Sequence, residues 1–383
     1  MQGRRLTVVQ LVPALDTGGV ERSTLEVAAA LVAAGHRSIV VSGGGRLVEA
    51  LTAGGSEHIQ RTIGKKSLFS LRHIGALRRL IHELKPDIVH ARSRLPAWLA
   101  HFALAGAPHP DTHFVTTAHG LNSPGRYSAI MTRGERVIAV SHTVRDYLIA
   151  NYEIDPARIV VIPRGIDPTQ FPYGHRPDED WTSAFFREFP SLEEAPLLTL
   201  PGRGTRLKGH ADAIELVAAL KARGIDTRLL LLGVVDPNRL AYVEELKRLA
   251  RSRGVADRVV FSRPRNDVHD VYAASALVLQ LSNKPEAFGR TVVEALALCR
   301  PVLGYAHGGV GELLSELYPA GRVPFGDFGR LVERAAELLR LAPAIPPLKR
   351  YDLAEMQRAT LALYAELAWG KTNGHVHPQA ALA

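Results

Sequence analysis

Short apolar runs along the chain alternate with longer segments in which apolar residues recur at helical spacing. In the first part of the chain, the short runs predict buried strands at Leu6–Val12, Ser38–Ser42, Asp87–Ala91, His113–Ala118, Arg136–Val140 and Arg158–Ile162. Helical patterns occupy the intervals, for example at Glu21–Ala34, Ser67–Leu84 and Thr143–Asn151. Strands and helices that alternate in this way are typical of a parallel, doubly wound sheet.

The alternation stops at a proline-rich segment that begins at Pro163, and it resumes after a predicted entry helix around Trp181–Phe189. The second series of apolar runs predicts strands at Leu197–Pro201, Thr227–Gly233, Arg258–Phe261, Ala276–Leu281, Pro301–Tyr305 and Gly321–Pro324. We therefore predict an α/β protein of two doubly wound, Rossmann-like domains, 1–172 and 173–351, that face each other across a cleft. A helix at 352–370 is expected to pack back near the first domain, followed by a flexible tail at 371–383.

Composition narrows the class of protein. The 383 residues suffice for two cores, and no apolar run approaches the length of a membrane span. The start of the chain leads directly into the first strand, which is unlike a signal peptide. Cys299 is the only cysteine, which excludes intrachain disulfides and favours a reducing cytoplasm. Because Cys299 lies beside an apolar helical face, we expect a buried thiol without a chemical role.

The formal net charge of +9 is unevenly distributed, and part of the excess lies in the segment 61–85. Beyond Arg61, its cations stand among apolar residues at helical spacing, and they are Lys65, Lys66, Arg72, Arg78, Arg79 and Lys85. One interpretation is a helix packed on its own sheet with arginines toward solvent. The other is peripheral contact with anionic lipid at the inner face of the cytoplasmic membrane, or with a phosphorylated glycolipid. No aromatic-interleaved basic patch supports nucleic-acid binding.

Two glutamates eight positions apart, Glu286 and Glu294, carry the strongest functional signal. The first follows the predicted strand Ala276–Leu281, and the second lies inside the next helix, so both are expected at the ligand-binding edge of the sheet. The backbone amides between them form a helix N-terminus that suits an anion, and they belong to Phe288, Gly289, Arg290 and Thr291. One segment thus offers acceptors for hydroxyls and donors for phosphate, both of which a nucleotide sugar needs.

A glycine-rich basic loop follows the first strand of the second domain, at Leu200–His210. Its glycines let the backbone approach a ligand, and Arg203 and Lys208 are candidates to bind a diphosphate. Taken alone, the loop would more often be a basic surface turn before a helix. It lacks the Gly-Lys-Ser/Thr of a P-loop.

Further candidates lie where other predicted strands end. Gly18 and Gly19 leave room for a ligand at a helix start, although a turn of this kind is usually structural. His119 follows a strand and precedes a glycine, so a role in the site and a local structural role remain equally open. Weaker candidates for the acceptor side or the wall of the site are Ser141, Arg164, His307, Gly308 and Gly309. The histidines are scattered and no cluster has metal-ligand spacing, so we expect neither a metal nor another cofactor.

Together these motifs resemble the retaining nucleotide-sugar glycosyltransferases of family four, which have the GT-B fold. The resemblance covers almost the whole chain and rests on Gly18-Gly19, His119-Gly120, Ser141, Ile162–Asp167, Gly202-Arg203 with Lys208-Gly209, and the two glutamates. The stretch 286–312 is also similar to bacterial enzymes that build lipopolysaccharide core or other envelope polysaccharides. Family members often carry glycine where Cys299 stands, and Pro201 and Gly204-Thr205 depart from the usual phosphate loop.

The resemblance implies a role for each matching residue. Arg203 and Lys208 would bind the diphosphate of a UDP-, GDP- or ADP-sugar, while Glu294 would bind the ribose hydroxyls. Glu286 and the amides after it would hold the transferred sugar. Gly18 and Gly19 would close over the diphosphate, and His119 would lie beside the sugar and a glycolipid or saccharide acceptor.

Two other function classes remain open. A nucleotide-sugar epimerase of similar fold would need further acid or base carboxylates, and the sequence offers no clear set. A non-catalytic protein that binds nucleotide sugars or a lipid surface would not need Glu286, Arg203, Lys208 and His119 together.

Overall fold

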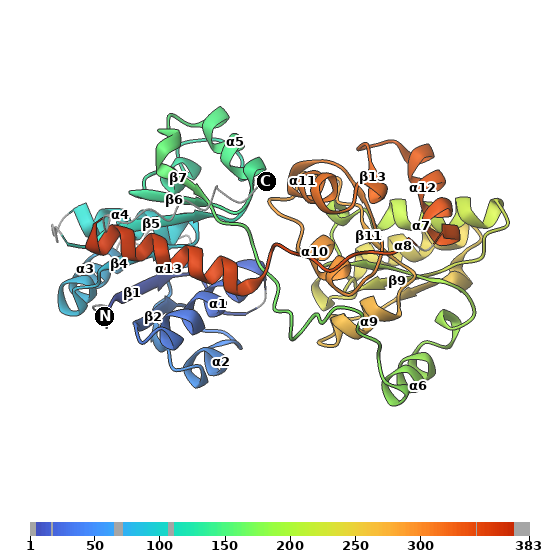
Figure 1. Cartoon of the computed structure of the whole chain (residues 1–383), viewed down its shortest axis with the longest axis horizontal. Helices are drawn as coiled ribbons and strands as arrows, with labels where there is room; N and C mark the ends of the chain where they lie inside the picture. Colours follow the sequence, from blue (N-terminus) through green and yellow to red (C-terminus); the bar gives the residue numbers. More distant parts are fainter. Residues whose placement is uncertain (1–4, 17, 65–71, 106–110, 342, 371–383) are drawn as a thin grey trace. The chain divides into compact units, whose positions relative to one another are not determined.

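The computed structural model of the chain describes residues 5–16, 18–64, 72–105, 111–341 and 343–370 (Figure 1). The chain divides into two compact units. The first comprises Met1–Val140, Val144–Pro163 and Ala354–Ala383, and the second comprises Ser141–Thr143 and Arg164–Leu353. Each unit is built on a parallel sheet, which confirms the predicted α/β class. The predicted tail at 371–383 lies outside the described residues.

The first unit contains a seven-stranded sheet in the order β3-β2-β1-β4-β5-β6-β7. Its strands are β1 (Thr7–Leu11), β2 (Arg37–Ser42), β3 (Glu57–Gln60), β4 (Ile88–Ala91), β5 (His113–Ala118), β6 (Arg136–Ala139) and β7 (Ile159–Val161). Neighbouring strands pair in parallel, so that Val9 lies opposite Ile39 on one side and Val89 on the other. The order reverses between β1 and β4, and ligands of doubly wound sheets bind at the carboxyl ends of such strands.

The six predicted strands of this sheet are all present, and β3 is an addition. Its sequence Glu-His-Ile-Gln lacks an apolar run, and its residues are partly or fully exposed at the edge of the sheet. The strand forms because the backbone pairs with β2, for example Ile59 opposite Val41. Backbone pairing at an edge leaves little hydrophobic signal, so periodicity could not reveal it.

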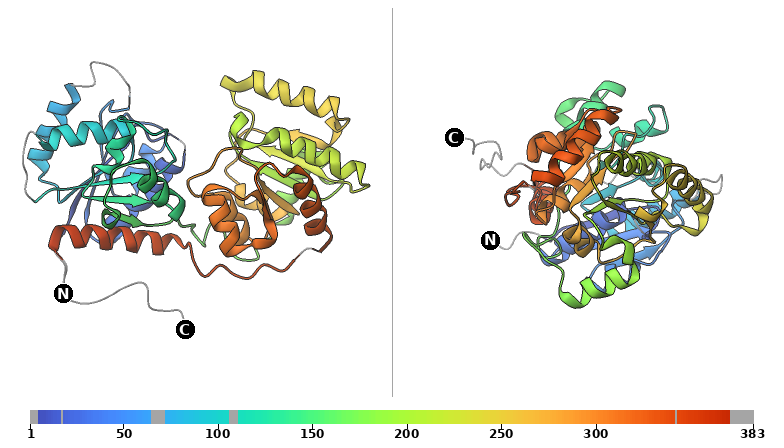
Figure 2. Two further views of the ribbon diagram at one scale, coloured as in Figure 1. Left: turned by 90° about the horizontal axis from the view of Figure 1, so that it is seen from above. Right: turned by 90° about the vertical axis from the view of Figure 1, so that its right-hand side faces the viewer.

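Helices of the first unit are α1 (Gly19–Ala33), α2 (Val48–Ala53), α3 (Arg72–Leu84), α4 (Arg94–Ala105), α5 (His142–Asn151) and α13 (Leu353–Trp369). The helix predicted at Ser67–Leu84 is described from Arg72 onward. The last helix, α13, lies along the seven-stranded sheet (Figure 2). The hydroxyl of its Tyr364 is 2.6 Å from Nδ1 of His90 on β4, and its Gln357 donates to the carbonyl of Glu26.

The second unit contains a six-stranded sheet in the order β10-β9-β8-β11-β12-β13. Its strands are β8 (Leu197–Pro201), β9 (Arg228–Leu232), β10 (Val259–Phe261), β11 (Leu277–Gln280), β12 (Val302–Tyr305) and β13 (Arg322–Val323). Its helices are α6 (Glu179–Glu188), α7 (His210–Ala222), α8 (Leu240–Ser252), α9 (Val268–Ala274), α10 (Arg290–Ala297), α11 (Gly308–Leu317) and α12 (Phe328–Leu341). The strand order again reverses between its first and fourth strands, β8 and β11.

The predicted strands of the second unit are likewise all present, and the apolar runs of the inner strands are buried on both faces. Each residue of β9, β11 and β12 is buried, and helices lie on both faces of the sheet (Figure 2). The entry helix α6 begins where Asp178 accepts a hydrogen bond from the amide of Trp181 at 2.7 Å. Among the described residues, every helix is too short or too polar to cross a membrane.

Candidate active site

Two loops meet at the point where the strand order of the second sheet reverses. The first follows β8 and leads from Gly202 to Gly209 at the start of α7. The second follows β11 and leads from Leu281 to Gly289 at the start of α10. Because β8 and β11 are paired neighbours, their loops emerge side by side from the carboxyl edge of the sheet. This edge is the usual ligand-binding position of a doubly wound sheet.

Lys208 and Glu286 form an ion pair between these loops. The lysine Nζ lies 2.5 Å from Oε1 of Glu286. The same oxygen accepts a hydrogen bond from the Ser282 hydroxyl at 2.5 Å, and Oε2 accepts one from Nε2 of Gln280 at 3.2 Å. The lysine and glutamate side chains are 28% and 23% exposed. A carboxylate fixed by three donors therefore stands beside a cation, and both remain accessible to a ligand.

The loop after β8 requires glycine at its end. Gly209 has a φ of 73°, and a Cβ there would stand 2.0 Å from the carbonyl oxygen of Leu281. The two loops are joined by the amide of Asn283, which donates to the carbonyl of Leu207 at 2.9 Å. Arg203 is exposed, and its guanidinium has no hydrogen-bond or ion-pair partner among the residues that the structure describes. This cation is available to a ligand.

The second loop ends at a helix N-terminus. Gly289 has a φ of 109° and precedes α10, whose first turn contains Arg290 and Thr291. Amides in the first turn of a helix have no acceptor within that helix, and the helix dipole makes the position favourable for an anion. The preceding residue, Phe288, is buried, and its ring packs against Tyr351 with centroids 5.7 Å apart. The side chain of Phe288 therefore anchors the loop, while a role for its amide stays a prediction.

The second glutamate of the pair, Glu294, lies in the second turn of α10 and is 8% exposed. Its Oε1 lies 3.3 Å from Nε of Arg290, one turn earlier on the same helix. The two predicted carboxylates thus have separate cationic neighbours, Lys208 for Glu286 and Arg290 for Glu294. Arg290 was predicted to contribute its backbone amide, and its side chain also pairs with that of Glu294.

The glycine turn at the start of α11 supports the loop that carries Glu286. The amide of Gly309 donates to the carbonyl of Glu286 at 2.7 Å, and Gly308 forms an isolated parallel bridge with the same residue. A Cβ on Gly308 would lie 2.6 Å from that carbonyl oxygen. Nε2 of His307 lies 2.6 Å from the carbonyl oxygen of Ser282. These three residues therefore position Glu286, and the amide of Gly309 is already occupied.

Two weaker candidates, Ser141 and Arg164, are also part of the second unit. The Ser141 hydroxyl donates to the carbonyl of Ala287 at 2.5 Å, and the serine is 1% exposed. Arg164 is 7% exposed. Ser141 thus contacts the backbone one residue beyond Glu286, which makes it a further support of that loop.

Three predicted residues lie on the first unit. Gly18 and Gly19 are exposed at the start of α1, where Gly18 is the residue before the helix. His119 is half-buried and comes directly after β5. All three stand at the carboxyl edge of the first sheet, and their roles toward a ligand remain predictions.

Sequence reasoning missed His210, the first residue of α7. Its side chain is fully buried, and burial lowers its pKa to about 4, so the imidazole is neutral at pH 7. The backbone of Gly202 and Thr205 acts in the opposite direction on this pKa. A neutral imidazole is thus buried directly after the loop that carries Lys208. Its position directly after Gly209 was the available signal.

The sequence analysis also did not single out Arg92, which comes directly after β4. It is buried at the reversal point of the first sheet, and its Nε donates to Oε1 of Gln10 at 2.7 Å. Burial lowers the pKa of its guanidinium. An arginine at the end of an apolar strand was the sequence signal for it.

Family models match both halves of the chain. The model of Glycosyltransferase Family 4 matches residues 17–170, and that of Glycosyl transferases group 1 matches residues 182–351. Among curated proteins, the chain is similar to a D-inositol 3-phosphate glycosyltransferase of Actinosynnema mirum, with 33% identity over 187 residues. That alignment covers 47% of this chain and 43% of the relative, so the chain matches less than half the length of this protein.

Solved structures are similar over nearly the whole chain. A glycosyltransferase from Rickettsia africae has a TM-score of 0.85 and 27% identity, with 97% of this chain and 100% of that chain covered. Anabaena Alr3699/HepE in complex with UDP and glucose has a TM-score of 0.78 and 19% identity, with 94% of this chain and 100% of that chain covered. Both likenesses support the GT-B fold. Because the two family regions occur in this order on two doubly wound sheets, the chain belongs to family 4 of the GT-B glycosyltransferases.

Proposed function

We propose that the protein is a retaining, metal-independent glycosyltransferase that moves a sugar from a nucleoside-diphosphate sugar to a glycolipid or saccharide acceptor. The observation that carries this proposal is the Lys208–Glu286 pair at the reversal point of the second sheet. The pair combines a cation for a diphosphate with an acceptor for sugar hydroxyls. The relative from Actinosynnema mirum supports glycosyl transfer, and the bound UDP and glucose of Anabaena HepE support a donor of this class.

The charges of the site suit a departing diphosphate. Glycosyl transfer passes through an oxocarbenium-like state, in which the leaving group gains negative charge. Lys208, the exposed Arg203 and the first amides of α10 would stabilise that charge more in the transition state than in the ground state. In this proposal they take the part that a divalent cation has in other transferases.

The two carboxylates would hold the sugars on either side of the diphosphate. Glu286 would accept hydrogen bonds from hydroxyls of the transferred sugar, because its carboxylate is already oriented by Ser282 and Gln280. Glu294, beside Arg290, would accept from the ribose. Hydrogen bonds to an ionised carboxylate are stronger than those between neutral groups. Both contacts would therefore orient the donor sugar and the ribose as well as bind them.

Retention of the anomeric configuration follows from the family resemblance. We assign Glu286 to the sugar hydroxyls, so the proposed mechanism has no dedicated nucleophile. The acceptor would then attack from the face that the diphosphate leaves, and an oxygen of the departing phosphate would take the acceptor proton. His119 is proposed to lie beside the sugar and the acceptor during this step.

A role in lipopolysaccharide core or other bacterial envelope synthesis is part of the proposal, together with peripheral membrane contact through 61–85. In the described part of this segment, Leu77 and Ile81 are buried and Arg79 is exposed. Arg78 instead donates to carbonyls of α4, those of Phe102 and Ala103, so it is less available to lipid than the pattern suggested. Lys65 and Lys66 lie outside the described residues.

The test is incubation of the full chain with a panel of labelled UDP-, GDP- and ADP-sugars, without added metal and with EDTA. A transferase is expected to hydrolyse its cognate donor slowly and to transfer the sugar faster once an acceptor is supplied. A changed sugar on an intact nucleotide would instead indicate an epimerase. Binding without turnover would indicate a non-catalytic protein, and a requirement for metal would contradict the metal-independent mechanism.

A further inference from the structure

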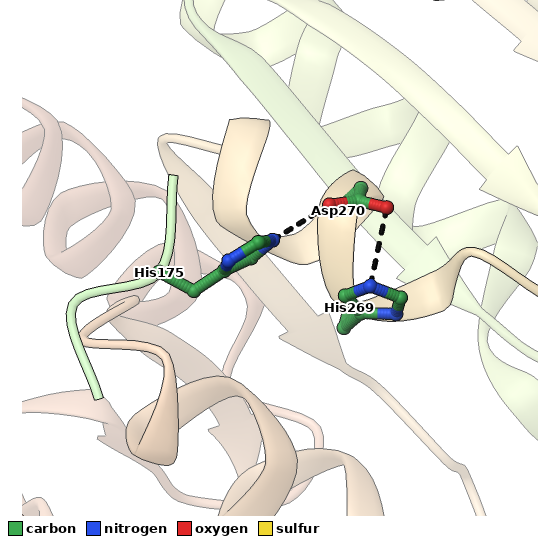
Figure 3. A group of neighbouring side chains, drawn as sticks. All are labelled: His175, His269 and Asp270. Carbon is green, nitrogen blue, oxygen red and sulfur yellow. Dashed lines mark hydrogen bonds and ion pairs between the residues drawn. The ribbon is translucent and has the colours of Figure 1, made fainter. Parts of the chain in front are cut away.

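Two histidines and an aspartate meet outside the Lys208–Glu286 site. Nε2 of His175 lies 2.6 Å from Oδ1 of Asp270, and Nε2 of His269 lies 3.2 Å from Oδ2 of the same carboxylate. Figure 3 shows the two imidazoles directed at Asp270 from different segments of the chain. His175 belongs to the segment before α6, and the other two residues belong to the first turn of α9. One ligand atom from each residue lies within 4.8 Å of the others.

The backbone and neighbouring side chains hold this cluster in place. The amide of His175 donates to the carbonyl of Pro172 at 3.1 Å, which forms a turn in the segment before α6. Asp267, the residue before α9, accepts from Nε1 of Trp181 at 2.7 Å and from the guanidinium of Arg265. The start of α9 is therefore anchored to α6, and α9 presents His269 and Asp270 from a fixed backbone.

The burial of the three side chains suits a bound ion that retains one solvent ligand. Asp270 is 14% exposed, His175 24% and His269 37%. Each carboxylate oxygen faces an imidazole nitrogen, so a cation bound by these three residues would replace the contacts between them. In the part of the chain that the structure describes, no other three His, Cys, Asp or Glu residues bring ligand atoms this close together.

We propose that His175, His269 and Asp270 form a zinc site that fastens the segment before α6 to α9. Two imidazole nitrogens and one carboxylate oxygen are a ligand set that Zn²⁺ accepts, with water as the fourth ligand. Ligand atoms of tetrahedral zinc lie about 3.3 Å apart when the bonds are about 2.0–2.1 Å long. The two nitrogen–oxygen separations, 2.6 and 3.2 Å, are shorter than that value, so the side chains would have to rotate apart slightly to complete the site.

The competing interpretation is a hydrogen-bonded cluster that binds no metal. His113 and Glu135 offer a comparison, because they form a partly exposed pair at 2.8 Å that contains one imidazole and one carboxylate. A single pair of this kind lacks the third ligand. Zinc binding at the proposed site should therefore depend on His269 and Asp270 and be insensitive to His113.

The site shares no residue with the Lys208–Glu286 pair, so zinc binding there is separate from the proposed transfer chemistry. Zinc is expected to raise the thermal midpoint of the chain by binding the folded state. It is not expected to be needed for donor hydrolysis. The zinc proposal and the proposed function can therefore fail independently of each other.

The experiment uses the full chain without a purification tag. His375 and His377 are replaced by glutamine in every sample, because tail histidines could bind metal themselves. Zinc chloride is titrated in competition with a chromogenic chelator. We expect one Zn²⁺ per chain with a dissociation constant in the micromolar range or tighter. We expect His269→Gln and Asp270→Asn each to weaken binding about tenfold or more, and the control His113→Gln to leave it unchanged.

Two further measurements use the same variants. Co²⁺ in place of Zn²⁺ should give the intense visible absorption of a four-coordinate ion in the parent chain and lose it in His269→Gln. The zinc-dependent rise of the thermal midpoint should disappear in the same variant, which reports on the site while the protein is folded. A stoichiometry well below one, or equal zinc affinity of the parent and His269→Gln, would overturn the proposal.

Discussion

Replacing Glu286 by glutamine should separate nucleotide binding from sugar transfer, two functions that the Lys208–Glu286 ion pair couples. The amide has nearly the same shape, so it can still accept the hydrogen bond from the Ser282 hydroxyl that now stands at 2.5 Å. What it removes is the negative charge beside Lys208. Because both side chains are about one quarter exposed, the pair is screened by solvent and we expect a loss of about 1 kcal/mol or less in stability.

The same change should have opposite effects on nucleotide binding and on transfer. In the free protein Glu286 competes with a diphosphate for Lys208, so its neutralisation should leave nucleotide affinity unchanged or raise it, by about tenfold at most for about 1.4 kcal/mol. Transfer should suffer instead. A hydrogen bond to a charged acceptor contributes about 1.5–3 kcal/mol. Loss of one or two such contacts to sugar hydroxyls therefore predicts a decrease of kcat by about 10²-fold or more.

Calorimetric titration with the nucleoside diphosphate of the cognate donor measures the first effect, and single-turnover donor hydrolysis measures the second. Glu245→Gln is the matched control. Glu245 lies on α8 and is the exposed ion-pair partner of Arg206, which belongs to the same loop as Lys208. Its neutralisation should alter neither nucleotide affinity nor donor hydrolysis. A parallel loss of nucleotide affinity and turnover in Glu286→Gln would refute the reasoning, since Glu286 would then act on the nucleotide or on the loop as a whole.

Three further predictions concern the same loop and the first residue of the helix that follows it. Lys208→Met should weaken nucleoside-diphosphate binding about 10- to 100-fold in calorimetry and lower kcat further, and unchanged affinity would remove Lys208 from the diphosphate site. Gly209→Ala should destabilise the chain by about 2 kcal/mol or more in urea unfolding, because its φ is 73° and the new Cβ would stand 2.0 Å from the Leu281 carbonyl; a smaller loss would mean that the loop adapts. Burial lowers the pKa of His210 from 6.5 to about 4, so between these values the unfolded state binds the additional proton and stability falls as the pH decreases. The full shift corresponds to about 3 kcal/mol, and urea unfolding at pH 7.5 and pH 4 should show a weaker pH dependence for His210→Gln; equal dependence would show that His210 is not the group responsible.

The sequence was most informative where burial and strand order decide the structure. Runs such as Leu197–Pro201 and Ala276–Leu281 predicted strands because a parallel sheet covered on both faces needs nearly continuous apolar residues. Lys208 and Glu286 come close in space because each follows one of the two strands at the reversal point. Their proximity could be inferred from topology without knowledge of any distance.

The sequence was least informative about backbone conformation and the state of buried polar groups. Cys299 was expected to be buried, but it is partly exposed and has a φ of 60°, a backbone conformation that glycine adopts more readily than cysteine. The amide of Gly309 donates to Glu286, which no pattern of residue types predicts. The neutral state of His210 depends on burial in the folded chain.

The most direct test of the central claim is a crystal structure of the chain with its cognate nucleoside-diphosphate sugar or a non-hydrolysable analogue. The diphosphate should lie within hydrogen-bond distance of Lys208 Nζ, Arg203 and the first amides of α10. The transferred sugar should contact Glu286, and the ribose should contact Glu294. A diphosphate bound away from the loops after β8 and β11, or a sugar without contact to Glu286, would contradict the account.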